Sequence, residues 1–292
     1  MIVDAHHHFW DPTRAAYPWM TEELAKIRKP YRPADLRPLL AEAGVERTVV
    51  VQARQDLAET RELLEMAART DFVAGVVGWV DLTDATVAQT LDDLRASPGG
   101  GKLVGIRHQV HDEGDPAWLL RPDVQRGLTA VGEAGLAYDL LVRTRELPAA
   151  VAAASLHSDL RLVVDHLGKP PIATGDDQEW AAAMAPLATF TNVYCKLSGL
   201  VTEADWSGWK PGDLAPYVRQ ALSWFGAERC MFGSDWPVCE LAASYAQVLE
   251  ALRFGLGELD ASSKAAVLGE TAASFYRLGP ASLDRRWSRV TV

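Results

Sequence analysis

The sequence predicts an α/β protein, a single-domain (β/α)8 TIM barrel that extends over residues 1–292. Short apolar runs rich in β-branched residues recur along the chain, a stretch of helical periodicity follows each run, and there are eight such units. This alternation is typical of a parallel sheet whose strands are buried on both faces, and eight units of this length indicate a barrel. No G-x-G-x-x-G motif follows a predicted strand, which disfavours the alternative of an open, dinucleotide-binding sheet.

The first strand is expected within residues 2–10, where an apolar start leads into a polar cluster. A connection rich in proline and aromatic residues follows, and long loops of this kind are usually functional. It leads into a helix at 33–43, which Gly44 can cap. The other strands are predicted at 46–54, 72–81, 103–108, 136–142, 160–166, 193–197 and 230–233. The other helices are predicted at 59–70, 85–95, 122–134, 146–156, 178–188, 213–225, 241–252 and 262–277.

Composition excludes several classes of partner. The formal charge is −10, with 29 basic and 39 acidic residues, which argues against nucleic acids and anionic membranes. No apolar run approaches the roughly 18 residues that a membrane helix needs. The three cysteines and the absence of a signal peptide are consistent with a soluble protein of the reducing cytoplasm.

The active site of such a barrel lies at the carboxyl ends of its strands. The predicted strands deliver ionisable groups to this rim, and six of the seven histidines lie there. The exception, His157, is expected at a helix C-terminus, which favours a positive charge. The polar residues at the strand ends are His6 and His8, Gln52 and Arg54, Trp79 and Asp81, Arg107 and His108, Tyr138 and Asp139, Asp165 and His166, Lys196 and Ser198, and Ser234, Asp235 and Trp236.

His6 and His8 are expected to share one face of the first strand and His7 to take the other, because strand side chains alternate. Together with His166 and Asp235, they can do one of two jobs. They can bind a divalent cation whose bound water attacks a carbonyl group. Alternatively, Asp235 takes a proton from water while imidazoles and arginines stabilise the resulting oxyanion without a metal.

The other polar residues divide into structural and binding candidates. Asp4, Asp139 and Asp165 are interpreted as structural, because each lies inside its strand or on the face opposite a better candidate. Arg54 and Arg107 suit a substrate carboxylate, hydroxyl groups or a developing negative charge. The candidates for apolar walls of the pocket are Trp10, Trp79 and Trp236.

Five motifs together resemble the amidohydrolase superfamily, and within it the sugar-lactonase branch of the L-fuconolactonase type. The motifs are His6-x-His8-x-Trp10, 105–109 (GIRHQ), 164–170 (VDHLGKP), 195–199 (CKLSG) and 232–237 (FGSDWP). The resemblance extends from residue 2 to about residue 277, and 196–206 (KLSGLVTEADW) is similar to that branch over its whole length.

The resemblance implies a hydrolase that opens a five- or six-membered sugar lactone, its small-molecule partner. It implies that Asp235 is the general base, and that His6, His8 and His166 are metal ligands or, in metal-free members, donors that orient the substrate. It assigns contacts with the lactone to Arg54, Arg107, His108 and Tyr138. The loops 11–33 and 112–122 are expected to select the substrate.

The sequence departs from the metal-dependent members of the superfamily at one point. Many of them supply a further ligand from the end of strand 4 or 5, whereas the fifth strand here ends Leu140-Leu141-Val142. We therefore expect that no cofactor is strictly required and that one divalent cation, Zn²⁺, can bind at His6, His8, His166 and Asp235. Two alternatives stay open: a metal-dependent decarboxylase or amidase of the same superfamily, and a non-catalytic sugar-acid binder.

Overall fold

Eight parallel strands form one sheet in the order β1-β2-β3-β4-β5-β6-β7-β8 in the computed structural model, which describes residues 1–279. Residues 280–292 of the predicted domain lie outside the described part. The strands are β1 (Val3–His7), β2 (Arg47–Val51), β3 (Val73–Gly78), β4 (Leu103–His108), β5 (Ala137–Leu140), β6 (Arg161–Val164), β7 (Val193–Leu197) and β8 (Cys230–Phe232). Several predicted strands are too long, because the polar residues at their carboxyl ends leave the sheet and form loops.

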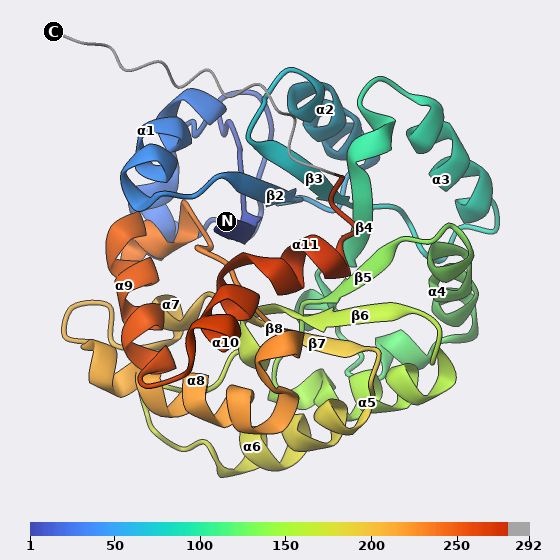
Figure 1. Ribbon diagram of the computed structural model, residues 1–292. Coiled ribbons are helices and arrows are strands. Elements are labelled where there is room, and N and C mark those ends of the chain that lie inside the picture. Colours follow the sequence, from blue (N-terminus) through green and yellow to red (C-terminus); the bar gives the residue numbers. More distant parts are fainter. Residues whose placement is uncertain (280–292) are drawn as a thin grey trace, which may run out of the picture.

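Helices surround this ring of strands (Figure 1), so the predicted (β/α)8 barrel is confirmed. They are α1 (Pro33–Ala43), α2 (Leu57–Ala68), α3 (Val87–Ala96), α4 (Pro122–Glu133), α5 (Leu147–Leu156), α6 (Gln178–Met184), α7 (Leu200–Glu203), α8 (Pro211–Phe225), α9 (Tyr245–Leu256), α10 (Ala261–Ala265) and α11 (Thr271–Phe275). The helix predicted at 262–277 is divided by a π-helical turn, Ala266–Glu270. Among residues 1–279, no helix combines the length and apolarity needed to cross a bilayer.

Two apolar clusters fill the space on either side of the strands. The larger cluster lies between the strands and the surrounding helices. The smaller one lies inside the barrel, where α11 crosses the ring of strands (Figure 1) and contributes Phe275, followed by Tyr276. These two aromatic rings close the amino-terminal end of the barrel, so polar side chains are left for its middle and its carboxyl end.

The ring is closed by hydrogen bonds between β1 and the segment after β8. The His8 amide donates to the Trp236 carbonyl oxygen at 2.7 Å, and the Asp235 amide donates to the His6 carbonyl oxygen at 2.8 Å. The residues that close the barrel are therefore also those whose side chains are expected to carry the chemistry. Closing the ring brings the Asp235 carboxylate beside the β1 histidines.

An irregularity in β1 aims His6 into the barrel. The pairing of β1 with β2 shifts register between Asp4 and His7. Ala5 belongs to the inner apolar cluster and the His6 side chain also faces inward, whereas His7 bonds Thr48 on the other face, with Nε2 and Oγ1 2.8 Å apart. A bulge of this kind re-aims side chains beside functional sites.

Candidate active site

Four buried side chains, from β1, from the residue directly after it and from the loops after β6 and β8, converge at the carboxyl end of the barrel. Asp235 Oδ1 lies 3.4 Å from His8 Nε2, 3.7 Å from His6 Nε2 and 3.9 Å from His166 Nε2. The Nε2 atoms of His6 and His8 are 3.2 Å apart. The structure therefore brings together the four residues in which the sequence predicts catalysis or metal binding.

The backbone is left-handed where two of these residues leave the barrel. His166 has φ 54° and Asp235 has φ 55°, and residues 166–169 all have positive φ. Each non-glycine residue in this conformation costs about 1–2 kcal/mol, and such strain is concentrated at functional sites. The turn places Asp165 and His166 on the same side, so both lie close to His6. The prediction that Asp165 faces away from the site is wrong, because the alternation of strand side chains ends at Val164.

Hydrogen bonds hold the second nitrogen of two imidazoles. His8 Nδ1 lies 2.8 Å from the Val51 carbonyl oxygen, which can only accept, so Nδ1 carries a proton, and in the neutral imidazole Nε2 presents a lone pair. His166 Nδ1 lies 2.9 Å from Ser198 Oγ. Partners of this kind orient imidazoles toward a substrate or a metal.

Gly199 holds His166 in place because it has no side chain. Its φ is +64°, and a Cβ atom at this position would lie 2.5 Å from His166 Nδ1. We expect Gly199→Ala to displace the imidazole and lower kcat/KM by at least about tenfold, equivalent to about 1.4 kcal/mol of transition-state stabilisation. Steady-state kinetics on a lactone substrate measure this loss.

Gly44→Ala is the matched control for this prediction. Gly44 also has a positive φ, +70°, but a Cβ atom there would meet nothing within 4 Å. Both variants incur the backbone penalty, and only Gly199→Ala should lose activity. Equal activities in the two variants would contradict the proposed contact with His166.

A layer of charged side chains lies beneath the imidazoles, inside the barrel. Lys196 Nζ lies 2.6 Å from Asp139 Oδ2, 2.9 Å from Asp165 Oδ1 and 3.2 Å from His6 Nδ1. Arg107 Nη1 lies 2.9 Å from Asp165 Oδ2 and 3.3 Å from His6 Nε2. All these side chains are buried, so each charge is neutralised inside the protein rather than by solvent.

Sequence reasoning did not assign site roles to Lys196, Asp139 and Asp165. A signal was present, because an ionisable residue within an apolar strand must find a partner when it is buried. Lys196 lies within the apolar run of β7 and Asp139 within that of β5. The sequence alone does not say that these two strands present their charges to each other.

The protonation states of the cluster follow from burial and neighbouring charges. Burial lowers the pKa of His6 well below its usual value and lowers that of His166 to about 4. Burial alone would raise the pKa of Asp235, but the neighbouring His166 and His8 outweigh it and hold that pKa below its usual value. At neutral pH the site therefore holds an ionised carboxylate beside neutral His6 and His166, and such a carboxylate can accept a proton from water.

His108 is held among three neighbours at the edge of the site. Trp79 Nε1 donates to His108 Nδ1 at 3.1 Å, so the imidazole proton resides on Nε2, which donates to Glu113 Oε1 at 2.7 Å. The His108 ring also stacks on Trp118, with centroids 4.0 Å apart. The predicted residues Trp79 and His108 thus lie together after β3 and at the end of β4.

Arg54 lies after β2, where its side chain contacts Tyr17 and Asp56. Its guanidinium packs over the Tyr17 ring at 5.5 Å and pairs with Asp56 at 2.9 Å. Behind it, Glu59 accepts hydrogen bonds from the amides of Ala53 and Arg54. Burial raises the pKa of Glu59 to about 7.

This raised pKa predicts how stability depends on pH. The folded protein favours protonated Glu59, so its contribution is fully present below pH 4.5 and is lost as the pH rises through about 7. The loss amounts to about 3 kcal/mol in the free energy of unfolding. We expect Glu59→Gln to flatten this decline when urea unfolding is compared at pH 5 and pH 8. Exposed Glu62→Gln is the control, and an undiminished decline in Glu59→Gln would contradict the prediction.

Three predicted substrate contacts are packed into the protein instead. Trp10 is 3% exposed and donates to the carbonyl oxygens of residues 27 and 29, while its ring stacks behind His8 at 6.0 Å. Trp236 is 1% exposed and donates to Glu240 at 2.9 Å. Tyr138 faces the outer cluster between strands and helices. The prediction that Tyr138 contacts substrate is wrong, because its neighbour Asp139 takes the inward position.

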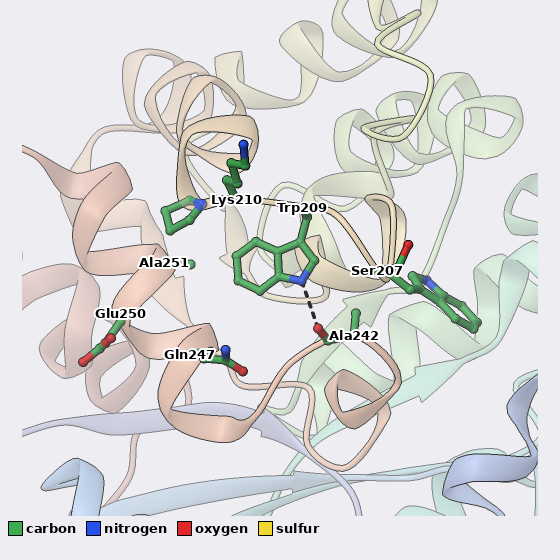
Figure 2. Close-up of a pocket in the computed structure, with 9 residues that line it drawn as sticks. Ser207, Trp209, Lys210, Ala242, Gln247, Glu250 and Ala251 are labelled. Carbon is green, nitrogen blue, oxygen red and sulfur yellow. Dashed lines mark hydrogen bonds between the residues drawn. The ribbon is translucent and has the colours of Figure 1, made fainter.

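A cavity of about 400 Å³ lies elsewhere, where the loop before α8 meets α9 (Figure 2). The Trp209 indole crosses it and donates to the Ala242 carbonyl oxygen at 2.9 Å. Its lining residues are Trp206, Ser207, Trp209, Lys210, Pro211, Ala242, Gln247, Glu250 and Ala251. None of them belongs to the histidine cluster, so the chemistry is not in this cavity.

The donor set of the cluster fits a divalent cation. Ligand atoms of His6, His8 and Asp235 lie within 4.8 Å of one another, and His166 is adjacent to them. Imidazole nitrogen and carboxylate oxygen are ligands that Zn²⁺ prefers, and the imidazoles already have partners on their second nitrogens. These residues could therefore hold a zinc ion.

A (β/α)8 barrel that carries imidazoles around an ionised carboxylate at the carboxyl ends of its strands defines a barrel hydrolase. The chain belongs to the amidohydrolase family, whose sequence model matches residues 3–278. It is 42% identical to an L-fucono-1,5-lactonase of Burkholderia ambifaria and 40% identical to one of Burkholderia multivorans, each over 97% of this chain and 98% of the relative. A crystal structure of a B. multivorans amidohydrolase with bound Zn has a TM-score of 0.90 and 39% identity, over 96% of this chain and 100% of that chain. The predicted family is confirmed.

Proposed function

We propose that this lactone hydrolase opens a sugar lactone of the L-fucono-1,5-lactone type to the corresponding hydroxy acid. The observation that carries the proposal is Asp235, an ionised carboxylate whose Oδ1 lies within 3.9 Å of three imidazole nitrogens. The similarity to two L-fucono-1,5-lactonases supports the choice of substrate.

In the proposed reaction, Asp235 removes a proton from a water molecule while the oxygen of that water attacks the lactone carbonyl carbon. The tetrahedral oxyanion is stabilised by Arg107, whose guanidinium faces the cluster. The bond between the carbonyl carbon and the ring oxygen then breaks, and protonated Asp235 returns its proton to the leaving alkoxide.

A metal is not strictly required in this proposal. The inward carboxylate of β5, Asp139, is committed to Lys196 and is not available as a further ligand. The residues that would hold a divalent cation are His6, His8, His166 and Asp235. Bound there, Zn²⁺ supplies a Lewis acid and lowers the pKa of a coordinated water.

A lactone screen tests the proposal. We expect L-fucono-1,5-lactone to be among the best substrates in a panel of aldono-1,4- and 1,5-lactones followed with a pH indicator. Because Asp235 can serve as the base without a metal, we expect activity to survive dialysis against a chelator. Failure to exceed spontaneous hydrolysis of every lactone would overturn the function. If dialysis against a chelator abolished activity and added Zn²⁺ restored it, lactone hydrolysis would stand, but the proposal that the reaction needs no metal would be overturned.

A further inference from the structure

Lys196 lies at the centre of the barrel, and no step of the proposed reaction uses it. Its side chain is fully buried between the ring of Tyr276, 5.5 Å from Nζ, and the imidazole of His6. We propose that Lys196 is a positioning residue that keeps the proton of His6 on Nε2 and thereby weakens the affinity of the site for a divalent cation.

Two groups compete for His6 Nδ1. Lys196 Nζ, 3.2 Å away, can only donate and therefore needs the Nδ1 lone pair. Asp165 Oδ1, 3.4 Å away, can only accept and therefore needs a proton on Nδ1. The two contacts select opposite tautomers of His6.

The neighbours of His6 complete the tautomer that Lys196 selects. With Nδ1 accepting from Lys196, the proton lies on Nε2, which can donate to His8 Nε2 at 3.2 Å. That atom is an acceptor, because His8 Nδ1 donates to the Val51 carbonyl oxygen. The chain from Lys196 through His6 and His8 to the backbone is therefore satisfied at every step. Arg107 Nη1, 3.3 Å from His6 Nε2, can only donate and favours the opposite tautomer; with Nε2 protonated it keeps its bond to Asp165 Oδ2 at 2.9 Å instead.

Only the other tautomer can bind a cation through His6. With Nδ1 donating to Asp165, Nε2 keeps its lone pair and faces the cluster, where Arg107 Nη1 lies 3.3 Å away. A metal must therefore displace the contact between Lys196 and Nδ1. Lys196 therefore opposes the metal by holding the tautomer of His6 that cannot bind it.

Removing Lys196 alone would leave Asp139 without its cation, which can prevent folding. The test variant is therefore Lys196→Met combined with Asp139→Asn, which removes one charge of each sign and leaves Asp165 paired with Arg107. The control is Lys102→Met. Lys102 is partly buried and donates to three backbone carbonyl oxygens, none of which belongs to the cluster.

Zinc affinity of the metal-free proteins, measured by competition with a chromogenic chelator, is the first readout. We expect the double variant to bind Zn²⁺ at least about tenfold more tightly than the wild-type protein, equivalent to about 1.4 kcal/mol. Lys102→Met should bind as the wild-type protein does. Unchanged or weaker binding by the double variant would overturn the proposal. This measurement needs no turnover, so it is independent of the proposed function.

The tautomer of His6 is the second readout and needs only the folded wild-type protein. Two-bond ¹H–¹⁵N correlation spectra of metal-free protein with labelled histidine distinguish a proton on Nδ1 from one on Nε2. The His6 resonance is identified by its loss in His6→Gln. We expect Nε2–H in the wild-type protein and a shift toward Nδ1–H in the double variant. Nδ1–H in the wild-type protein would overturn the proposal even if the double variant did not fold.

Discussion

Asp235→Asn is expected to lower kcat for lactone hydrolysis by about 10³- to 10⁴-fold, the upper part of the range for loss of a general base. Asparagine keeps the shape of the side chain but cannot accept a proton from water. The backbone N–H of residue 235 still donates to the His6 carbonyl oxygen in this variant, so the barrel should still close. Steady-state kinetics and the melting temperature together measure this separation of activity from folding.

Asp81→Asn is the matched control for this prediction. Asp81 also follows a strand, but it is exposed, and its side chain accepts hydrogen bonds from the amide and the hydroxyl of Thr83 in its own loop. We expect this variant to retain wild-type kcat. Near-normal turnover by Asp235→Asn would exclude Asp235 as the base, whatever the behaviour of the control.

Arg107→Met is expected to have the second-largest effect, because it damages both stability and activity. The substitution removes one of the two cationic side chains that pair with Asp165, and it leaves the Gln52 carbonyl oxygen without its hydrogen-bond donor. Breaking a buried ion pair costs about 3–5 kcal/mol, and we expect the lower end because Lys196 still pairs with Asp165. We expect kcat/KM to fall at least about 100-fold, as when a donor to an oxyanion is lost. Urea unfolding and steady-state kinetics measure the two losses.

An exposed arginine provides the comparison. Arg37 also bonds a single aspartate, Asp71, through two nitrogens at 2.7 and 3.3 Å, but on the surface. Surface pairs contribute about 0–1 kcal/mol, so Arg37→Met should change stability little and activity not at all. If the two variants were equally stable and equally active, the role assigned to Arg107 would be wrong.

Much of this site could be predicted because it depends on strand order and direction. The apolar runs predict eight parallel strands, and parallel strands place all their carboxyl ends at one rim. His6, His8, His166 and Asp235 follow such runs, so their convergence required no knowledge of side-chain packing. The prediction that His6 and His8 point to the same face follows from the two-residue period of a strand.

The same period failed where the backbone departs from a regular strand. The register shift in β1 turns His6 inward together with Ala5, and the left-handed turn at His166 brings Asp165 to the same side. Within β5 the period holds, but the inward position belongs to Asp139 and Tyr138 faces outward. Each outcome depends on hydrogen bonds or charges from strands distant in the sequence.

The sequence by itself determined the barrel, its family, and the carboxylate with the three imidazoles that surround it. It could do so because hydrophobic pattern and strand direction are local properties. Only the tertiary structure decided how those residues are held: Lys196 and Arg107 beneath His6, Gly199 against His166, and Trp10 packed behind His8. The reason is that charge neutralisation and close packing are satisfied between strands, and a sequence does not state which strands become neighbours at the level of single atoms.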